Sequence, residues 1–426
     1  MSVAADRQPR GTLTRTAVVA VVTLGITQII SWGTTFYALG VLAEPIRQDT
    51  GWSLTTVYAG ATVSLLAAAL VSTWVGRKID QRGARLVMTS GSMAMAGALV
   101  LIAVSGSPLV YLAAWALAGV TARLTQYDAA FAALVQIDAR NGRRLIAYLT
   151  LFGGFASSVF WPIGHVLAES YGWRGTFFIF AGLNLLICVP LHWFCLPAPA
   201  ATRGAAAATG PAPKSPQDKP AAAIELPPLA GVSRTLGIVL FSIVMGAYSF
   251  VFGVGAVHLV GILEASGVAL ATAVALGAFK GVAQVIGRVG ELVYGHRLAP
   301  LMLGRVSIAL LPLSFLPLLF MAGGYETALA FVLVYGISNG LMTIVRGAVP
   351  LALFGAEGYG VLLGVLATPA LLVTAASPVV FAWLVEAHGY RAGAWVLFAC
   401  GLVGWLALEV LKAWYERRAI PAAQTG

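Results

Sequence analysis

Four ionisable side chains stand out inside long apolar stretches of the sequence: Arg123, Asp128, Lys280 and Arg346. A charge at the centre of a membrane-spanning helix costs about 2.5–3.5 kcal/mol on insertion scales, so such residues usually serve binding or ion coupling. Asp128 is the one carboxylate well inside an apolar stretch, and its protonation would release a neighbouring arginine. The sequence therefore predicts proton coupling at Asp128 and substrate binding by Arg123, Lys280 and Arg346.

A structural alternative stays open for part of this set. Asp128 and Arg346 lie at nearly equivalent depths in their stretches and could form an ion pair that only stabilises the fold. Lys280 has no acid within two helical turns, which favours a role facing the substrate. Three cations against one acid leave a net charge of +2, and a cavity with that excess would attract anions.

The composition places these charges in a membrane protein. Of the 426 residues 59% are hydrophobic and 10% are charged, whereas soluble domains carry about 25% charged residues. A net charge of +10 would suggest nucleic acid as the partner of a soluble domain. In a chain this apolar it indicates basic loops that face an anionic membrane surface, so no nucleic-acid partner is expected. Three cysteines exclude a disulfide framework.

Twelve apolar stretches alternate with polar or Gly/Pro-containing breaks along the chain. A membrane-spanning helix needs about 20 mainly apolar residues, and each stretch meets that length. Because lipid offers no hydrogen-bond partners, the backbone at these positions must pair within helices. The sequence thus predicts an all-α integral membrane protein with twelve transmembrane helices. The predicted spans are 17–43, 53–75, 84–104, 109–136, 144–168, 175–196, 235–262, 269–290, 299–321, 326–350, 358–384 and 392–413.

The basic residues predict the orientation. Of the 26 Lys and Arg residues, only Arg47, Arg174 and Arg391 fall in loops on the side away from the N-terminus. Loops rich in Lys and Arg are cytoplasmic, so both termini are predicted to be cytoplasmic. Short loops and the lack of a targeting segment favour a cell inner (plasma) membrane.

Proline and alanine mark a division in the middle of the chain. Residues 197–234 hold eight of the twenty prolines and could not bury a core, so we expect a flexible cytoplasmic linker. It would separate a six-helix half at 17–196 from another at 235–413. Cytoplasmic tails are expected at 1–16 and 414–426.

The two halves repeat each other. Residues 169–174 read Glu-Ser-Tyr-Gly-Trp-Arg and residues 386–391 read Glu-Ala-His-Gly-Tyr-Arg, an offset of 217. A Gly-Arg pair followed by an acid occurs at 76–80 and again at 287–291, an offset of 211. Two matches at nearly one offset predict pseudo-symmetric halves, an architecture typical of secondary transporters with a site between the halves.

The segment Gly-Arg-Lys-Ile-Asp-Gln-Arg-Gly-Ala-Arg at 76–85 resembles the loop motif of the major facilitator superfamily. Glycine allows the tight turn, and an acid with nearby arginines can pair across one face of the protein. Asp138 is expected to join Arg82 or Arg85. The resemblance implies the major facilitator fold and a cytoplasmic gating motif made by Gly76, Asp80, Arg82, Gly83, Arg85, Asp138, Gly287 and Glu291.

A second resemblance concerns a branch of that superfamily. Arg-Arg-Leu-Ile-Ala at 143–147, leading into Gly-Gly-Phe-Ala-Ser at 153–157, looks like the helix 5 entry of monocarboxylate and oxalate–formate transporters. Trp-Gly at 32–33 and Gly-Trp-Ser at 51–53 are similar to that branch too. There, a basic residue of helix 8 binds a carboxylate, and Lys280 is the position onto which that role carries.

Together these features predict a secondary transporter that works by alternating access, coupled to protons, for a small organic anion such as a monocarboxylate. The alternative is an efflux pump for hydrophobic drugs or for a toxic metalloid such as arsenite, with Cys188 and Cys195 as candidate ligands. No metal-ligand cluster, nucleophile elbow or phosphate-binding loop is found, so neither an enzyme nor a cofactor is expected. We expect a monomer in the lipid bilayer.

Overall fold

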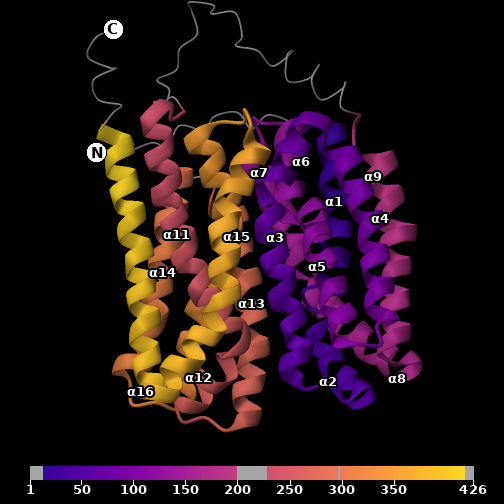
Figure 1. Cartoon of the computed structure of the whole chain (residues 1–426). Coiled ribbons are helices and arrows are strands. Elements are labelled where there is room, and N and C mark those ends of the chain that lie inside the picture. Colours follow the sequence, from indigo (N-terminus) through magenta and orange to yellow (C-terminus); the bar gives the residue numbers. More distant parts are fainter. Residues whose placement is uncertain (1–12, 199–227, 296–297, 418–426) are drawn as a thin grey trace, which may run out of the picture.

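The computed structural model describes residues 13–198, 228–295 and 298–417. In these ranges the chain is helical and contains no strand. The helices form two bundles side by side, one indigo to magenta and the other salmon to yellow in Figure 1.

The first bundle is built from residues 15–195. Its helices are α1 (Arg15–Thr34), α2 (Leu39–Thr50), α3 (Leu54–Arg82), α4 (Ala84–Ala103), α5 (Pro108–Thr125), α6 (Tyr127–Ile137), α7 (Gly142–Gly154), α8 (Ala156–Leu183), the π-helical segment η1 (Asn184–Cys188) and α9 (Val189–Cys195).

The second bundle is built from residues 231–417. Its helices are α11 (Gly231–Val257), α12 (Leu259–Ala265), α13 (Leu270–Tyr294), α14 (Pro300–Phe320), α15 (Tyr325–Phe354) and α16 (Tyr359–Arg417).

Turns inside two long helical stretches bring the number of membrane crossings to the predicted twelve. Ten helical stretches of the described residues are long and apolar enough to cross a membrane. Two of them, Gly142–Cys195 and Tyr359–Arg417, have 54 and 59 residues, about twice what one crossing needs. Each turns back at a glycine with positive φ, Gly172 at 68° and Gly389 at 76°. These glycines are themselves 217 residues apart, so the turns obey the repeat found in the sequence.

Close helix contacts follow the same repeat. A Cβ added to Gly119 of α5 would lie 2.0 Å from the carbonyl oxygen of Ser64 on α3. A Cβ added to Gly336 of α15 would lie 2.8 Å from the carbonyl oxygen of Lys280 on α13. Small residues let helices approach where lipid supplies no hydrophobic driving force between them. Both bundles therefore use glycine for the same packing contact.

The start of α1 and the end of α16 lie at one end of the bundles, at the top of Figure 1. We call this the terminal end, and the opposite end, where α2 and α12 lie, the distal end. At the terminal end α3 packs against α16, and α7 packs against α13 and α15. Among the described residues, the hydrogen bonds that join the two bundles fall in this terminal part or near mid-depth. The halves are therefore closed against each other at the terminal end.

The expected linker lies largely outside the described residues, because 199–227 are not among them. The second half begins earlier than predicted: α11 starts at Gly231, and the backbone N–H of Leu229 donates to the carbonyl of Leu353 at 2.8 Å. At the other end α16 continues to Arg417, past the predicted limit of 413.

Candidate functional site

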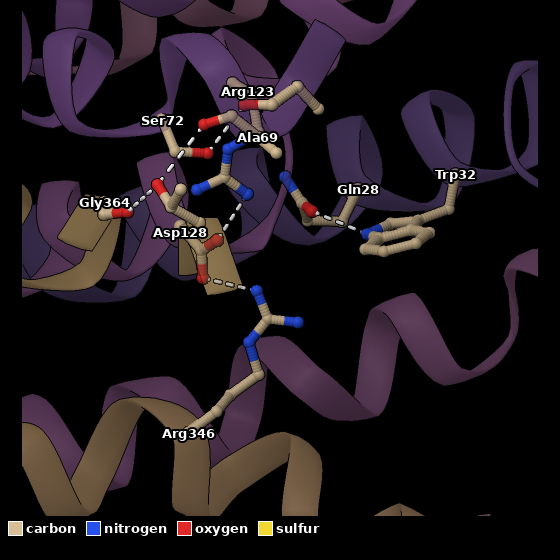
Figure 2. Close-up of polar contacts among 10 residues, drawn as sticks. Gln28, Trp32, Ala69, Ser72, Arg123, Asp128, Arg346 and Gly364 are labelled. Carbon is tan, nitrogen blue, oxygen red and sulfur yellow. Dashed lines mark hydrogen bonds and ion pairs between the residues drawn. The ribbon is translucent and has the colours of Figure 1, made fainter. Parts of the chain in front are cut away.

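Asp128 lies between two arginines at the boundary of the halves (Figure 2). Its Oδ1 accepts a hydrogen bond from Nη2 of Arg346 at 2.5 Å, and α15 brings that arginine from the second half. Its Oδ2 lies 2.5 Å from Nη1 of Arg123 on α5, as an ion pair without the angle of a hydrogen bond. Three of the four predicted charges thus form one cluster, which we call the Arg–Asp–Arg triad.

A break in the fourth crossing positions the triad. Gln126 has an extended conformation (φ −83°, ψ −168°) and separates α5 from α6. The break exposes the carbonyl of Thr125, which accepts a hydrogen bond from the side chain of Gln28 on α1 at 2.7 Å. Asp128 falls in the first turn of α6, where the helix dipole favours a negative charge. The interruption therefore turns Asp128 toward the second half while the freed backbone stays paired.

The two arginines differ in accessibility. The side chain of Arg123 is 7% exposed, and its Nε is buried without a hydrogen-bond partner. The side chain of Arg346 is 27% exposed. Arg346 is therefore the cation of the triad that a solute between the halves can reach.

Arg288 is a further buried cation, which the sequence reasoning did not single out. It lies on α13, is 5% exposed, and its Nη1 donates to the carbonyl of Thr150 in the first half at 3.0 Å. Its Nη2 donates to the hydroxyl of Thr343 at 3.3 Å, and among the described residues it has no carboxylate partner. Arg288 falls near the end of the predicted span 269–290, and α13 continues beyond it to Tyr294. Its position inside that span is the signal that could have shown a buried cation.

Lys280 lies apart from the triad in its contacts. Its Nζ is 5.7 Å from the centroid of the Tyr335 ring, and it forms no ion pair with any described residue. The side chain is half-buried on α13. Its role in substrate binding stays a prediction.

Aromatic rings line the boundary between the halves on the distal side of the triad. Trp32 of α1 contacts Tyr127 and Phe36, with ring centroids 5.2 Å and 5.6 Å away. Phe36 lies 6.4 Å from Phe252 of the second half, and Phe252 is 5.8 Å from Tyr248. The indole N–H of Trp32 donates to Gln28 (Figure 2), so its ring is fixed beside the triad.

Asp80 joins the halves at the terminal end. Its two carboxylate oxygens accept hydrogen bonds from the backbone N–H groups of Gly360 and Val361, at 3.0 Å and 2.8 Å. These groups belong to the first turn of α16, whose positive dipole end favours an anion. Gly76 lies one turn before Asp80, and a Cβ added there would be 2.0 Å from the carbonyl oxygen of Gly360. Gly83 has φ of 79° and makes the turn into α4.

Glu291 makes a second connection at the terminal end. Its Oε1 accepts hydrogen bonds from Arg143 of α7, the shorter at 3.0 Å from Nη2. The same guanidinium donates to the carbonyls of Gly295 and Leu298, at 2.6 Å and 2.5 Å. One arginine of the first half is thus held by three acceptors of the second.

The expected pairing of Asp138 with Arg82 or Arg85 is not found. Asp138 follows the end of α6, and its carboxylate accepts hydrogen bonds from the backbone and side chain of Asn141. Arg85 instead stacks on the Trp193 ring at 4.5 Å. The local turn into α7 satisfies Asp138 first, because its partner is three residues away.

The two candidate metalloid ligands lie in the last helical segments of the first bundle. Cys188 is buried in η1 and Cys195 is half-buried at the end of α9. Within the described ranges, no group of three or more His, Cys, Asp or Glu side chains could hold a metal ion.

Two pseudo-symmetric helical halves, closed at one end and meeting at buried charges, define a membrane transporter for a small molecule rather than an enzyme. The sequence profile of the Major Facilitator Superfamily matches residues 24–342, and the chain belongs to that family. It is a multi-pass membrane protein of the major facilitator fold.

Solved structures resemble the chain over nearly its whole length. The human organic anion transporter MFSD10 (TETRAN) matches with a TM-score of 0.71 and 15% identity, over 94% of this chain and 100% of that one. FucP in the outward conformation matches with a TM-score of 0.67 and 13% identity, over 93% and 99%. A variant of the E. coli fucose:proton symporter FucP gives a TM-score of 0.63, with 12% identity over 93% and 99%. Such low identities show the fold alone. No curated sequence matches the chain.

Proposed function

We propose that this transporter moves a small organic anion such as a monocarboxylate together with protons, in a cell inner membrane with its terminal end cytoplasmic. The observation that carries the proposal is Asp128, held between Arg123 of its own half and the accessible Arg346 of the other half. The excess of basic residues in loops at the terminal end supports the orientation.

The triad links a proton to an anion. While Asp128 is charged, it occupies Arg346, and the cation is not free for substrate. Protonation of Asp128 removes that competitor and also weakens the ion pair between Asp128 and Arg123. A substrate carboxylate then replaces the lost negative charge next to Arg346. Proton and anion therefore favour each other's binding, as coupled transport in one direction requires.

The surrounding charge also favours an anion. Arg288 and Lys280 have no carboxylate partner among the described residues, and the triad itself carries two cations and one acid. Closed at the terminal end, the halves would release such a substrate inward by rocking about this boundary. The resemblance to the monocarboxylate and oxalate–formate branch agrees with this choice of substrate.

The test is uptake of labelled monocarboxylates by purified protein in proteoliposomes, with and without a pH gradient, acid outside. We expect accumulation that collapses when a protonophore removes the gradient. Transport of hydrophobic cations or arsenite, without any response to carboxylates, would contradict the proposal and favour the efflux alternative.

A further inference from the structure

The boundary site combines its cations with an aromatic wall, which we define as Trp32, Phe36, Tyr127, Tyr248 and Phe252. The wall is continuous across the halves, since each ring lies within 6.4 Å of the next along the path from Tyr127 to Tyr248. Small hydrophilic anions such as acetate have no surface with which so many rings could pack. The wall therefore indicates that the anion also carries an apolar group that packs against aromatic rings.

Two rings of the wall come from opposite halves and lie nearly parallel. Phe36 and Phe252 have an interplanar angle of 23° and a centroid separation of 6.4 Å. A flat ring can pack on the face of either phenylalanine, with carbon contacts of about 3.5–4.0 Å. The ring of Phe36 is 37% exposed, so one side of it is open.

Two tyrosines connect the wall to the cations. Tyr127 directly precedes Asp128 of the triad on α6, and Tyr248 lies on α11 of the other half. Neither phenol hydroxyl is hydrogen-bonded to any described residue, and neither is among the fully buried polar atoms without a partner. Each can therefore donate to a carboxylate held by the arginines.

We propose that the substrate is an aromatic monocarboxylate, bound with its carboxylate toward Arg346 and its ring against Phe36 and Phe252. This inference rests on the proposed function and adds that the apolar part of the substrate is aromatic. Aromatic pairs in offset or edge-to-face geometry add to the stabilisation that area burial alone provides. Because the two phenylalanines belong to different halves, a bound ring also contacts both halves at once.

The experiment compares three labelled anions in proteoliposomes of the wild-type protein: benzoate, cyclohexanecarboxylate and acetate. Benzoate and cyclohexanecarboxylate have similar size and hydrophobicity, but only benzoate is flat and aromatic. We expect the apparent affinity for benzoate to exceed that for cyclohexanecarboxylate by about three- to tenfold, the range that one or two aromatic pairs supply. Equal affinities would overturn the inference.

Variants separate the wall from the cations. Phe252→Leu should lower the apparent affinity for benzoate by about three- to tenfold relative to that for acetate, which has no ring to lose. Trp395→Leu is the matched control, because Trp395 contacts Phe320 and Phe398 instead of the wall. If Phe252→Leu folds poorly, Phe36→Leu answers the same question.

The experiment distinguishes failure of the aromatic inference from failure of the proposed function. Acetate transport with no preference for benzoate would overturn the aromatic inference and leave the proposed function standing. Absence of transport for all three carboxylates would overturn both.

Discussion

Asp80 and Glu291 hold equivalent places in the two halves, and both reach across to the other half at the terminal end. The residues that they contact are equivalent as well, since Gly360 and Arg143 are 217 residues apart. Asp80 accepts from the backbone of Gly360, whereas Glu291 accepts from the side chain of Arg143. The two halves thus carry contacts to each other at equivalent positions. One contact is made to backbone N–H groups and the other to an arginine side chain.

The first prediction concerns the unequal strength of the Asp80 and Glu291 contacts between the halves. Asp80→Asn should open the terminal end more readily, because an amide accepts from α16 with one oxygen and no charge. Hydrogen bonds to charged groups contribute about 1.5–3 kcal/mol, so we expect roughly a tenfold shift toward the open state. Glu291→Gln should shift it less, because Arg143 keeps two carbonyl acceptors in the second half.

Spin labels at positions 82 and 357, which are exposed on opposite halves at the terminal end, would report the shift as a longer distance population. The three native cysteines are replaced beforehand. Equal shifts for the two variants would show that the Glu291–Arg143 contact is as strong as the contact of Asp80 with the backbone of α16.

The second prediction concerns coupling. Asp128→Asn should abolish accumulation driven by a pH gradient and retain exchange of labelled for unlabelled substrate, because Arg346 is freed in every state. Breaking a buried ion pair by removing one partner costs about 3–5 kcal/mol, so melting temperature is measured in parallel. Glu44→Gln is the control, since Glu44 forms an exposed pair with Arg47 on α2. Uptake by Asp128→Asn that still follows the pH gradient would exclude Asp128 as the proton carrier.

Much of this architecture could be predicted from the sequence, because apolar length and the repeat are direct consequences of the bilayer and of symmetry. The pairing of Asp128 with Arg346 was a natural expectation at an offset of 218 residues, one from the repeat. The break at Gln126 was not predicted, since it depends on Gln28 of another helix to satisfy the freed carbonyl. Arg288 was missed and Asp138 misassigned for a related reason: helix ends and local turns decide their partners, and neither is visible in hydropathy.

The third prediction concerns Lys280, whose charge has no acidic partner among the described residues. Lys280→Ala should weaken anion binding at least about tenfold if the ammonium contacts the carboxylate, whereas Lys280→Arg should retain part of it. A thermal-shift titration with the transported anion measures this on purified protein. Unchanged binding in Lys280→Ala would remove Lys280 from the site and leave Arg346 and Arg288 as the cations.

The fourth prediction tests whether the closed terminal end is needed for transport. Alanine is a better helix former than glycine by about 1 kcal/mol, so Gly76→Ala should not harm the isolated helix. In the closed state its Cβ would lie 2.0 Å from the carbonyl oxygen of Gly360, a backbone atom that cannot move alone. The variant should therefore favour the state open at the terminal end, show the long distance between labels at 82 and 357, and transport poorly. Gly97→Ala is the matched control, because a Cβ there has no atom within 4 Å. Normal transport by Gly76→Ala would mean that the α3–α16 contact loosens at little cost, and that closure depends on the Arg143 side of the boundary instead.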